Sequence, residues 1–266
     1  GHPASFSDAA IQSCLTLKGL FGLGLRQTTG LVASLLRLCG LDWAVPDFST
    51  LSRRGKTLAV AVPYRPSSGA LHLLVDSTGI KLRGDGEWHR RKHGRDRPRR
   101  WLKLHLAVDA ESLQVRAIEV TDGDVGDSSM LPHLLDQISP QETLSQVTAD
   151  GAYDTRPCRA AIAARGAAAL IPPRRNGQPW SDDAPGAVTR NEALRACRRL
   201  GWRVWRTWSS YHVRSRVEAT MACLKRLGER IMARQFDRQV AELQVRAAIL
   251  NRFTTLGTPV TQLVHV

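Results

Sequence analysis

Two aspartates lie in apolar surroundings where a carboxylate is unexpected. Asp76 stands within the run Leu-Leu-Val-Asp-Ser-Thr-Gly-Ile-Lys, and burying it there costs several kcal/mol unless a cation or hydrogen-bond donors satisfy it. An exposed strand position bonded to its own turn is the alternative for Asp76. Asp150 follows Val-Thr-Ala and precedes Gly151, which predicts a tight turn at the carboxyl end of a strand, where α/β sheets bind ligands. A turn or capping aspartate is the alternative there, although Asp154, before the next predicted helix, fits that role better.

A third acid is part of a spaced set of polar residues. Tyr211, Arg214, Glu218 and Lys225 are separated by three, four and seven positions, which places all four along one stripe of a helix. A surface helix with an ordinary Arg–Glu ion pair explains the spacing in isolation equally well.

Three carboxylates that converge from two strands and a helix would suit Mg²⁺, or Mn²⁺ in its place, because these ions prefer hard oxygen ligands. Two such ions can activate a water or a sugar hydroxyl and stabilise the leaving oxygen of a phosphodiester. The sequence therefore predicts a metal-dependent phosphodiester site, with Asp76, Asp150 and Glu218 as catalytic residues and metal ligands. No side-chain nucleophile is required.

The elements that would position these acids alternate between strands and helices. Alternating apolar residues predict strands, and apolar residues at helical spacing predict helices. The predicted strands are 71–82, 101–109, 114–120, 146–149 and 167–171, and the predicted helices are 127–138, 155–165 and a segment around 191–200 within otherwise looped residues 172–207. This order is typical of an α/β domain, a mixed sheet flanked by helices.

The first part of the chain has a helical pattern instead. Ser7 or Asp8 can cap a first helix, a second follows, and residues 46–54 begin with capping residues and end with Arg53 and Arg54. The last segment resembles the second helix of a helix-turn-helix, with both arginines as candidate DNA contacts; a packing helix with a solvated basic end is the alternative. A Pro/Ser/Gly-rich linker separates a helical DNA-binding or assembly domain, residues 1–63, from a catalytic domain, residues 64–266.

Composition narrows the partners and the compartment. Lysine and arginine exceed the acids by 14, which favours a polyanion such as DNA, although a dispersed surface charge is the alternative. The five cysteines form no C-x-x-C pair, which argues against disulfides and a zinc ribbon and favours a reducing cytoplasm. The most apolar stretch is interrupted by charges and glycines, so no membrane span is expected.

A basic segment at 83–100 lies between two predicted strands. Its length and charge favour contacts to the phosphate backbone, and a solvated hairpin is the alternative. The candidate DNA contacts here are Arg90, Arg91, Lys92, Arg99 and Arg100.

Other histidines and tryptophans have plainer explanations. His89 and His93 have metal-like spacing but lack accompanying acids or cysteines, so zinc is not expected. His105 could face the site, although a hydrogen-bonded sheet histidine explains it as well. Three tryptophans at three-residue spacing, Trp202, Trp205 and Trp208, are expected to form a core stripe.

Taken together, the motifs resemble those of a known family. LLVDSTGIK, WLKLHLAVD, DGAYDT and the Tyr-x2-Arg-x3-Glu-x6-Lys signature, with FSDAAIQSCLTLKGLFGLGLRQTTGLVASLL and VPDFSTLSRR before them, resemble the DDE transposases of the bacterial insertion-sequence-five family. The resemblance implies an RNase H-like core whose metal-binding acids are Asp76, Asp150 and Glu218. It also implies that Tyr211, Arg214 and Lys225 engage DNA near the cut. Members usually carry a further upstream basic segment that is absent from this sequence.

The resemblance also implies an activity and partners. A transposase of this kind releases a 3′ hydroxyl at each terminal inverted repeat, and that hydroxyl attacks target DNA. Because two ends must be held together, a homodimer or larger assembly on double-stranded DNA is expected, associated with the bacterial nucleoid. Two alternatives share the same residues: an inactive or domesticated DNA-binding derivative, and an RNase H-like nuclease without strand transfer.

Overall fold

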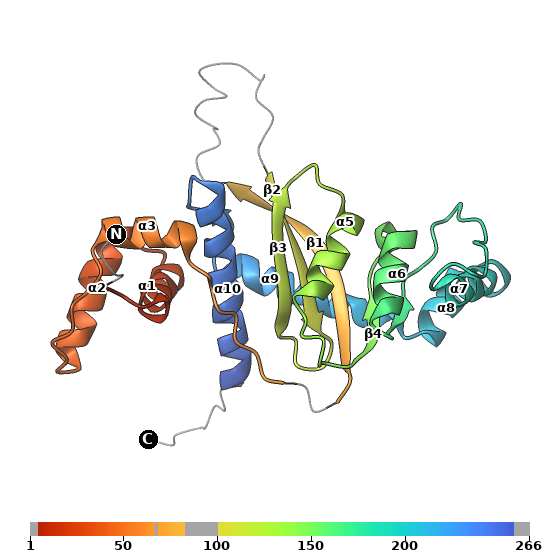
Figure 1. Cartoon of the computed structure of the whole chain (residues 1–266), viewed down its shortest axis with the longest axis horizontal. Coiled ribbons are helices and arrows are strands. Elements are labelled where there is room, and N and C mark those ends of the chain that lie inside the picture. The colour runs from red at the N-terminus through yellow and green to blue at the C-terminus, as the bar shows by residue number, and fades with distance from the viewer. Residues whose placement is uncertain (1–4, 67–68, 83–100, 258–266) are drawn as a thin grey trace, which may run out of the picture.

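The computed structural model of the chain describes residues 5–66, 69–82 and 101–257 (Figure 1). Within these ranges the molecule has three parts along its long axis. Helices from the N-terminal part lie at one end, a mixed sheet lies in the middle, and two helices from residues 187–208 lie at the other end.

The sheet has the order β3-β2-β1-β4-β5, and a short sixth strand pairs with the far end of β1. The first three strands are antiparallel neighbours, whereas β4 and β5 run parallel to β1. The bounds are β1 Leu71–Leu82, β2 Trp101–Asp109, β3 Val115–Asp122, β4 Leu144–Thr148, β5 Ala168–Leu170 and β6 Arg230–Ile231. A mixed sheet of this order with helices on both faces is an RNase H-like α/β fold, so the predicted fold class is confirmed.

Each face of the sheet is covered by its own pair of helices. Helices α5 (Asp127–Asp136) and α6 (Arg156–Ala164) pack on one face, and α9 (Ser215–Arg226) and α10 (Phe236–Leu256) pack on the other. Side chains of β1 alternate between the two cores, as the two-residue period of a strand requires. The predicted strands 71–82 and 101–109 have the bounds that the structure shows.

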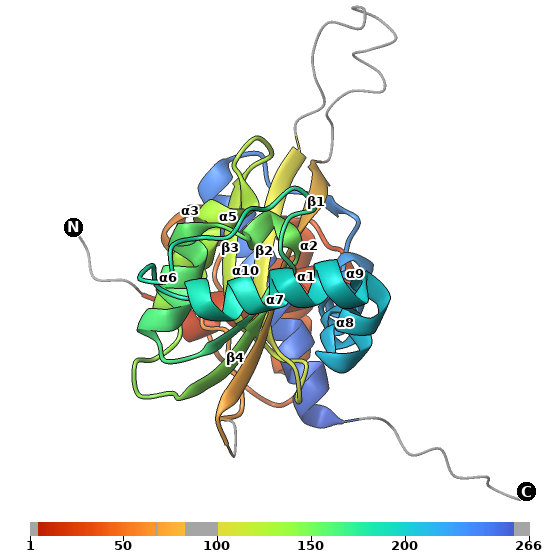
Figure 2. The same ribbon diagram turned by 90° about the vertical axis from the view of Figure 1, so that its right-hand side faces the viewer.

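The second half of the chain contains elements that the sequence pattern did not predict. Residues 172–207 form α7 (Ala187–Leu200), which was expected in part, and α8 (Trp202–Trp208), which was not (Figure 2). Helix α10 and strand β6 were also not predicted. The long α10 has apolar residues on several sides because it lies between the sheet and the N-terminal helices (Figure 1).

The N-terminal part consists of three helices, as predicted. They are α1 (Asp8–Phe21), α2 (Leu25–Leu38) and α3 (Phe48–Thr57). Ser7 and Asp47 cap α1 and α3, accepting hydrogen bonds from the amides of Ala10 (3.2 Å) and Thr50 (2.6 Å). The three helices share a small core of their own, and α1 and α3 also pack on α10, where Arg238 Nε donates to the Ser52 carbonyl at 2.9 Å. The proposed domain boundary at residue 64 stays a prediction.

Candidate active site

Asp76 lies at the point where the sheet opens. β4 pairs with β1 only as far as Leu74, so beyond it β1 keeps β2 as its neighbour until β6 joins at Lys81, among the strands that the structure describes. The Asp76 side chain is 14% exposed, which rules out the alternative of an exposed turn aspartate. Its Oδ1 accepts the Ser77 amide at 2.9 Å and its Oδ2 accepts Arg214 Nη1 at 2.7 Å. Burial raises the pKa of Asp76, and these two partners act against that shift.

Asp150 follows β4, the strand beside β1. It caps the 3₁₀ turn Gly151–Tyr153, with its Oδ1 accepting the Ala152 amide at 2.9 Å. The expectation that Asp154 would fit a capping role better was wrong, because Thr155 caps α6. Asp154 is buried instead and pairs with Arg159 at 2.9 Å and Arg190 at 3.2 Å. A capping role and a position at a strand end are both compatible with Asp150 as a ligand.

Glu218 reaches the site from α9 on the α10 side of the sheet. Arg214 Nη2 donates to Glu218 Oε1 at 2.5 Å, so the ordinary Arg–Glu ion pair is present. The prediction of one helix from Tyr211 to Lys225 was only partly right, since Tyr211–Arg214 forms a 3₁₀ turn that leads into α9. Lys225, near the end of α9, donates to Thr78 Oγ1 on β1 at 2.6 Å. Helix α9 and strand β1 are thus linked twice, by Arg214 before the first turn of the helix and by Lys225 in its last turn.

Arg214 joins two of the predicted metal ligands. The same guanidinium contacts Asp76 and Glu218, which are 142 positions apart in the sequence. Burial acts to lower the pKa of Arg214, but nearby negative charges, first that of Asp76 and also those of Glu218 and Asp150, outweigh it and raise the pKa. Arg214 therefore stays positively charged and brings two acids of the predicted triplet together.

Tyr211 is held by aromatic packing. Its ring lies 5.5 Å from that of Trp202 and 5.6 Å from that of Trp205, and burial raises its pKa to about 12, so its hydroxyl is protonated at neutral pH. The core-stripe prediction holds for buried Trp205 but is wrong for Trp202 and Trp208, which are 44% and 74% exposed.

The donor set suits a hard divalent cation, although the acids are not gathered tightly. Within residues 5–66, 69–82 and 101–257, no group of three or more His, Cys, Asp or Glu is close enough to hold a metal ion. Carboxylates repel one another, and here the Arg214 guanidinium lies between Asp76 and Glu218 and bridges them. The carboxylate oxygens of Asp76, Asp150 and Glu218 are hard donors, the type of ligand that Mg²⁺ or Mn²⁺ prefers.

The predicted DNA contacts fare differently. Arg53 is exposed on α3, whereas Arg54 donates to the Phe6 carbonyl at 2.8 Å and forms an ion pair with Asp8. Arg54 therefore ties α3 to the start of α1. The DNA contacts predicted in the basic segment at 83–100 lie outside the described residues: Arg90, Arg91, Lys92, Arg99 and Arg100. His89 and His93 also lie outside them.

Residues behind Asp76 were missed or underrated by the sequence analysis. Asp127 accepts the Ser77 hydroxyl at 2.7 Å and lies 3.1 Å from Lys103 Nζ. His105 is a hydrogen-bonded sheet histidine, since its Nε2 lies 2.9 Å from Thr121 Oγ1 and its side chain is fully buried. The available signals were the acid at the start of a predicted helix and the alternation of Lys103 with His105. Neither of these two sequence signals indicates which strand the side chains of Asp127, Lys103 and His105 contact.

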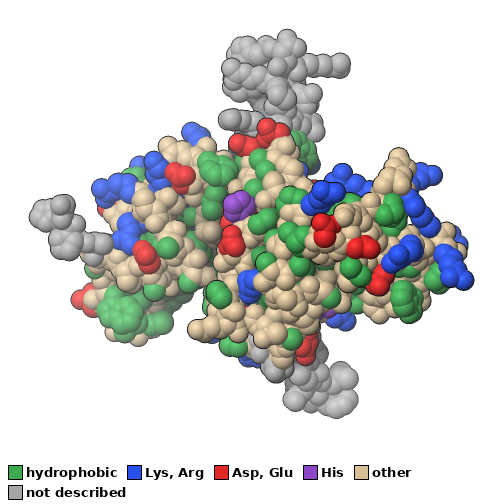
Figure 3. Space-filling model, turned by 45° about the vertical axis from the view of Figure 1, so that its right-hand side comes forward, with side chains coloured by type: hydrophobic (Ala, Val, Ile, Leu, Met, Phe, Trp, Pro, Cys, Tyr) green, Lys and Arg blue, Asp and Glu red, His purple; other side chains and the backbone are tan. Residues whose placement is uncertain are grey.

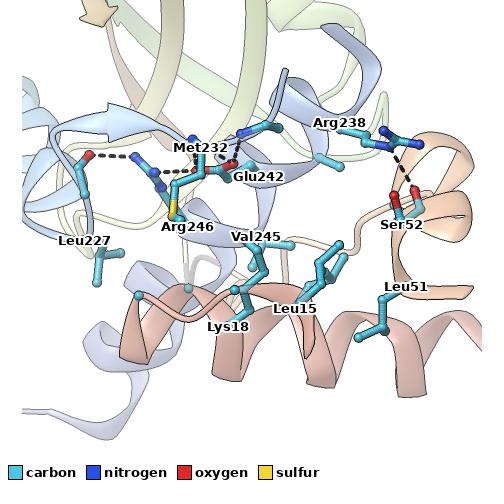
Figure 4. A pocket seen from close by; sticks show the side chains of 18 of the residues that line it. Leu15, Lys18, Leu51, Ser52, Leu227, Met232, Arg238, Glu242, Val245 and Arg246 are labelled. Carbon is cyan, nitrogen blue, oxygen red and sulfur yellow. Dashed lines mark hydrogen bonds and ion pairs between the residues drawn. The ribbon is translucent and has the colours of Figure 1, made fainter. Parts of the chain in front are cut away.

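One cavity lies away from the acids. It measures about 400 Å³ and separates α1 and α3 from α10, with Leu15, Leu51 and Val245 on its apolar walls (Figure 4). At one side Arg246 donates to Glu242 at 2.5 Å, and Glu242 accepts the Met232 amide at 3.0 Å. None of the three predicted ligands lines this cavity, so it is a feature of the contact between the N-terminal helices and α10.

An RNase H-like sheet with acids at the opening between its central strands defines a class of metal-dependent enzymes that act on phosphodiesters. Two family models, each described as a transposase DDE domain, match this chain, one over residues 67–252 and the other over residues 1–85. The chain belongs to the DDE transposases, enzymes of DNA transposition that use divalent metal ions.

Two solved structures are also similar to this chain, at low identity. A simian T-cell lymphotropic virus intasome in complex with PP2A regulatory subunit B56 gamma is 14% identical over 86% of this chain and 74% of that chain, with a TM-score of 0.28. A pre-cleavage Mos1 transpososome is 12% identical over 84% and 80%, also with a TM-score of 0.28. The family assignment rests on the family models and not on these two structures. No helix in the described part of the chain has the length and apolar character needed to cross a membrane.

Proposed function

We propose that this DDE transposase cleaves DNA at the terminal inverted repeats of a bacterial insertion sequence, of the insertion-sequence-five type, and joins the released 3′ hydroxyl to target DNA. The observation that carries the proposal is Arg214, whose guanidinium gathers Asp76 and Glu218 beside the strand that leads to Asp150. This contact brings side chains from two distant parts of the sequence together beside the open stretch of β1, which supports the proposal.

Asp76, Asp150 and Glu218 would hold the divalent ion, with Mg²⁺ as the proposed natural cofactor and Mn²⁺ as a substitute. When bound, such ions activate the attacking oxygen and stabilise the leaving oxygen of a phosphodiester. The carboxylates are arranged for this task by different means. Asp76 is fixed by its strand and by the Ser77 amide, whereas Asp150 is fixed by capping a turn.

Arg214 and Lys225 provide positive charge next to the acids. A divalent ion shared by Asp76 and Glu218 would compete with Arg214 for the same oxygens. The guanidinium would then be available to a DNA phosphate, which it can contact through two parallel hydrogen bonds. Tyr211 stays neutral and can donate its hydroxyl hydrogen to the same phosphate or to a base.

The surface supports a DNA partner. Lysine and arginine side chains gather at both ends of the molecule in the view of Figure 3, over the N-terminal helices and over the helices at the opposite end. The second group includes Arg195, Arg198, Arg199, Arg203 and Arg206 of α7 and α8. Positive charge at two separate places suits contacts to DNA on both sides of the acids. A homodimer or larger assembly on DNA would hold two element ends together.

The test is cleavage and joining of a labelled duplex that carries the repeats flanking its gene, in Mg²⁺, with Asp150→Asn as the comparison. Asparagine keeps the size and the capping oxygen but removes the charge. Joined products with the wild-type chain alone would support the proposal. Cut ends that are never joined would favour a nuclease, and DNA that is bound but uncut by either protein would favour an inactive DNA-binding derivative.

A further inference from the structure

The stretch of β1 that carries Asp76 has less backbone support than the rest of the strand. From Leu71 to Leu74 the strand has β2 on one side and β4 on the other, and β6 joins at Lys81. Between these points, among the strands that the structure describes, β1 hydrogen-bonds only to β2. A strand segment open on one side is easier to displace, because its outer amides and carbonyls lack a ladder.

Side chains support this open stretch at three consecutive residues. Arg214 contacts Asp76, Lys225 donates to Thr78, and between them Ser77 donates its hydroxyl to Asp127 at 2.7 Å. Successive residues of a strand face opposite ways, so the first two contacts come from the α9 side and the third from the α5 side. The strand is therefore held from both faces where the ladder is open.

Asp127 is itself held firmly at the first residue of α5. Lys103, on the neighbouring strand, lies 3.1 Å from Asp127 Oδ1 and also donates to the Val125 carbonyl at 2.7 Å. Ser77 and His105 are partners across β1 and β2, and His105 Nδ1 lies 3.8 Å from the same carboxylate oxygen. The carboxylate is three-quarters buried, so its bond to Ser77 is shielded from water.

Two buried polar groups near Asp127 make no competing hydrogen bonds in the part of the chain that the structure describes. His105 Nδ1 and the Tyr153 hydroxyl have no hydrogen-bond partner within the described residues. Burial raises the pKa of Tyr153, and the negative charge of Asp127 raises it more than that of Asp76 or Asp150. Tyr153 thus stays a neutral donor among three carboxylates.

We propose that Asp127 is a positioning residue for Asp76: it holds the open stretch of β1 from the α5 side through the hydroxyl of Ser77. The Ser77 amide donates to Asp76 Oδ1 at 2.9 Å, so displacement of Ser77 moves the donor that orients the catalytic carboxylate. The catalytic consequence rests on the proposed function of Asp76, whereas the tether itself does not. Asp127 acts through Ser77 and does not itself touch the DNA.

The experiment measures two properties of the full chain in Ser77→Ala, Asp127→Ala, the double variant and Asp127→Asn. Amide hydrogen exchange of residues 75–80 reports the tether, and cleavage of the labelled repeat duplex reports its catalytic effect. Asp136→Asn, an exposed acid at the other end of the same helix, is the matched control. Exchange in α5 separates loss of the tether from fraying of the helix, because an acid at a helix N-terminus also stabilises the helix.

Each single alanine variant should speed exchange at residues 75–80 by about tenfold or more and slow cleavage by about 10- to 100-fold, because small displacements at a reacting centre are costly. The double variant should lose no more than the worse single variant, since both remove one interaction. Asp127→Asn keeps an oxygen for Ser77 and should recover most of the protection. Asp136→Asn should match the wild type.

Unchanged exchange at residues 75–80 in Asp127→Ala, or losses that multiply in the double variant, would overturn the inference. Exchange faster throughout the chain would also overturn it, because it would indicate a general loss of stability. If the wild-type chain fails to cleave the duplex, the proposed function fails, and the exchange data still decide whether the tether exists.

Discussion

The two halves of β1 are stabilised by different means. Leu71 to Leu74 is buried between two strand neighbours, with side chains at most 1% exposed apart from His72. From Asp76 to Ile80, β1 has only β2 as a neighbour among the described strands, and this stretch has charged or polar side-chain contacts to Arg214, Asp127 and Lys225. An open strand edge is a weakness in a fold, and under the proposed function it is the edge at which DNA would approach Asp76. The comparison shows that the site lies where the backbone ladder is incomplete.

The largest expected effect is the loss of DNA cleavage when Asp76, in the second half of β1, is replaced. Asp76→Asn should abolish detectable cleavage in Mg²⁺ and in Mn²⁺, because the neutral amide cannot replace a carboxylate as a ligand. The unfolding free energy should stay the same or rise slightly, since a largely buried carboxylate is removed. Cleavage assays with thermal unfolding on the same samples check this. A variant that cleaves normally would show that Asp76 is not a ligand.

A substitution in the first half of β1 should lower the stability of the protein and leave cleavage nearly unchanged. Leu73 is fully buried in the α5-side core, so Leu73→Ala should lower the unfolding free energy by about 2–5 kcal/mol through lost burial and the cavity it leaves. Cleavage per folded molecule should change little. Denaturant unfolding measures the first quantity, and cleavage normalised to the folded fraction measures the second. A large loss of cleavage rate in the folded fraction would show that the two halves of β1 do not differ in this way.

The third prediction concerns pH and the strand next to β1. Burial lowers the pKa of His105 to about 4 from 6.5, so the unfolded chain binds the proton more tightly than the folded chain. Stability should therefore fall as the pH drops from about 6.5 towards 4, by roughly 3 kcal/mol from this group, and be fully restored above that window. His105→Gln should show a shallower decline than the wild type in unfolding curves at several pH values. If the stability of the wild type and of His105→Gln fell equally as the pH dropped, a group other than His105 would be responsible for the decline.

The smallest effect should come from the contact at Thr78. Lys225→Met and Thr78→Val each remove the 2.6 Å hydrogen bond and should lower the unfolding free energy by about 1 kcal/mol. If Lys225 also contacts DNA, Lys225→Met should weaken DNA binding and make it less sensitive to salt, whereas Thr78→Val should not. Binding isotherms at two salt concentrations check this. Equal binding by both variants would restrict Lys225 to a structural role.

Much of the fold follows from local patterns. The period of apolar residues predicted β1 and β2 with their bounds, because apolar side chains of these strands alternate between the two cores. It failed for α8 and α10. In α8, tryptophans at helical spacing do not all face a core, and α10 packs on two sides, which weakens its amphipathic signal.

The candidate site could be predicted in type but not in its contacts. The spacing of Arg214 and Glu218 predicted their ion pair, since residues four apart meet on a helix. The bond from Arg214 to Asp76 and the bond from Ser77 to Asp127 span 138 and 50 positions, and no local periodicity encodes such distances. Asp154, which the sequence favoured as a cap, is instead buried in ion pairs with Arg159 on the following helix and with Arg190, which is 36 positions away.

The sequence alone predicted the fold class, the acidic triplet, the signature around Glu218 and the family that they resemble, because these depend on residue types at fixed spacing. Only the tertiary structure decided that the ladder of β1 is open at Asp76, that Arg214 closes the gap between two acids, and that Asp127 supports the strand from the other face. The reason is that strand pairing and side-chain contact across a sheet depend on how distant segments pack together, and the order of residues along the chain does not state that packing.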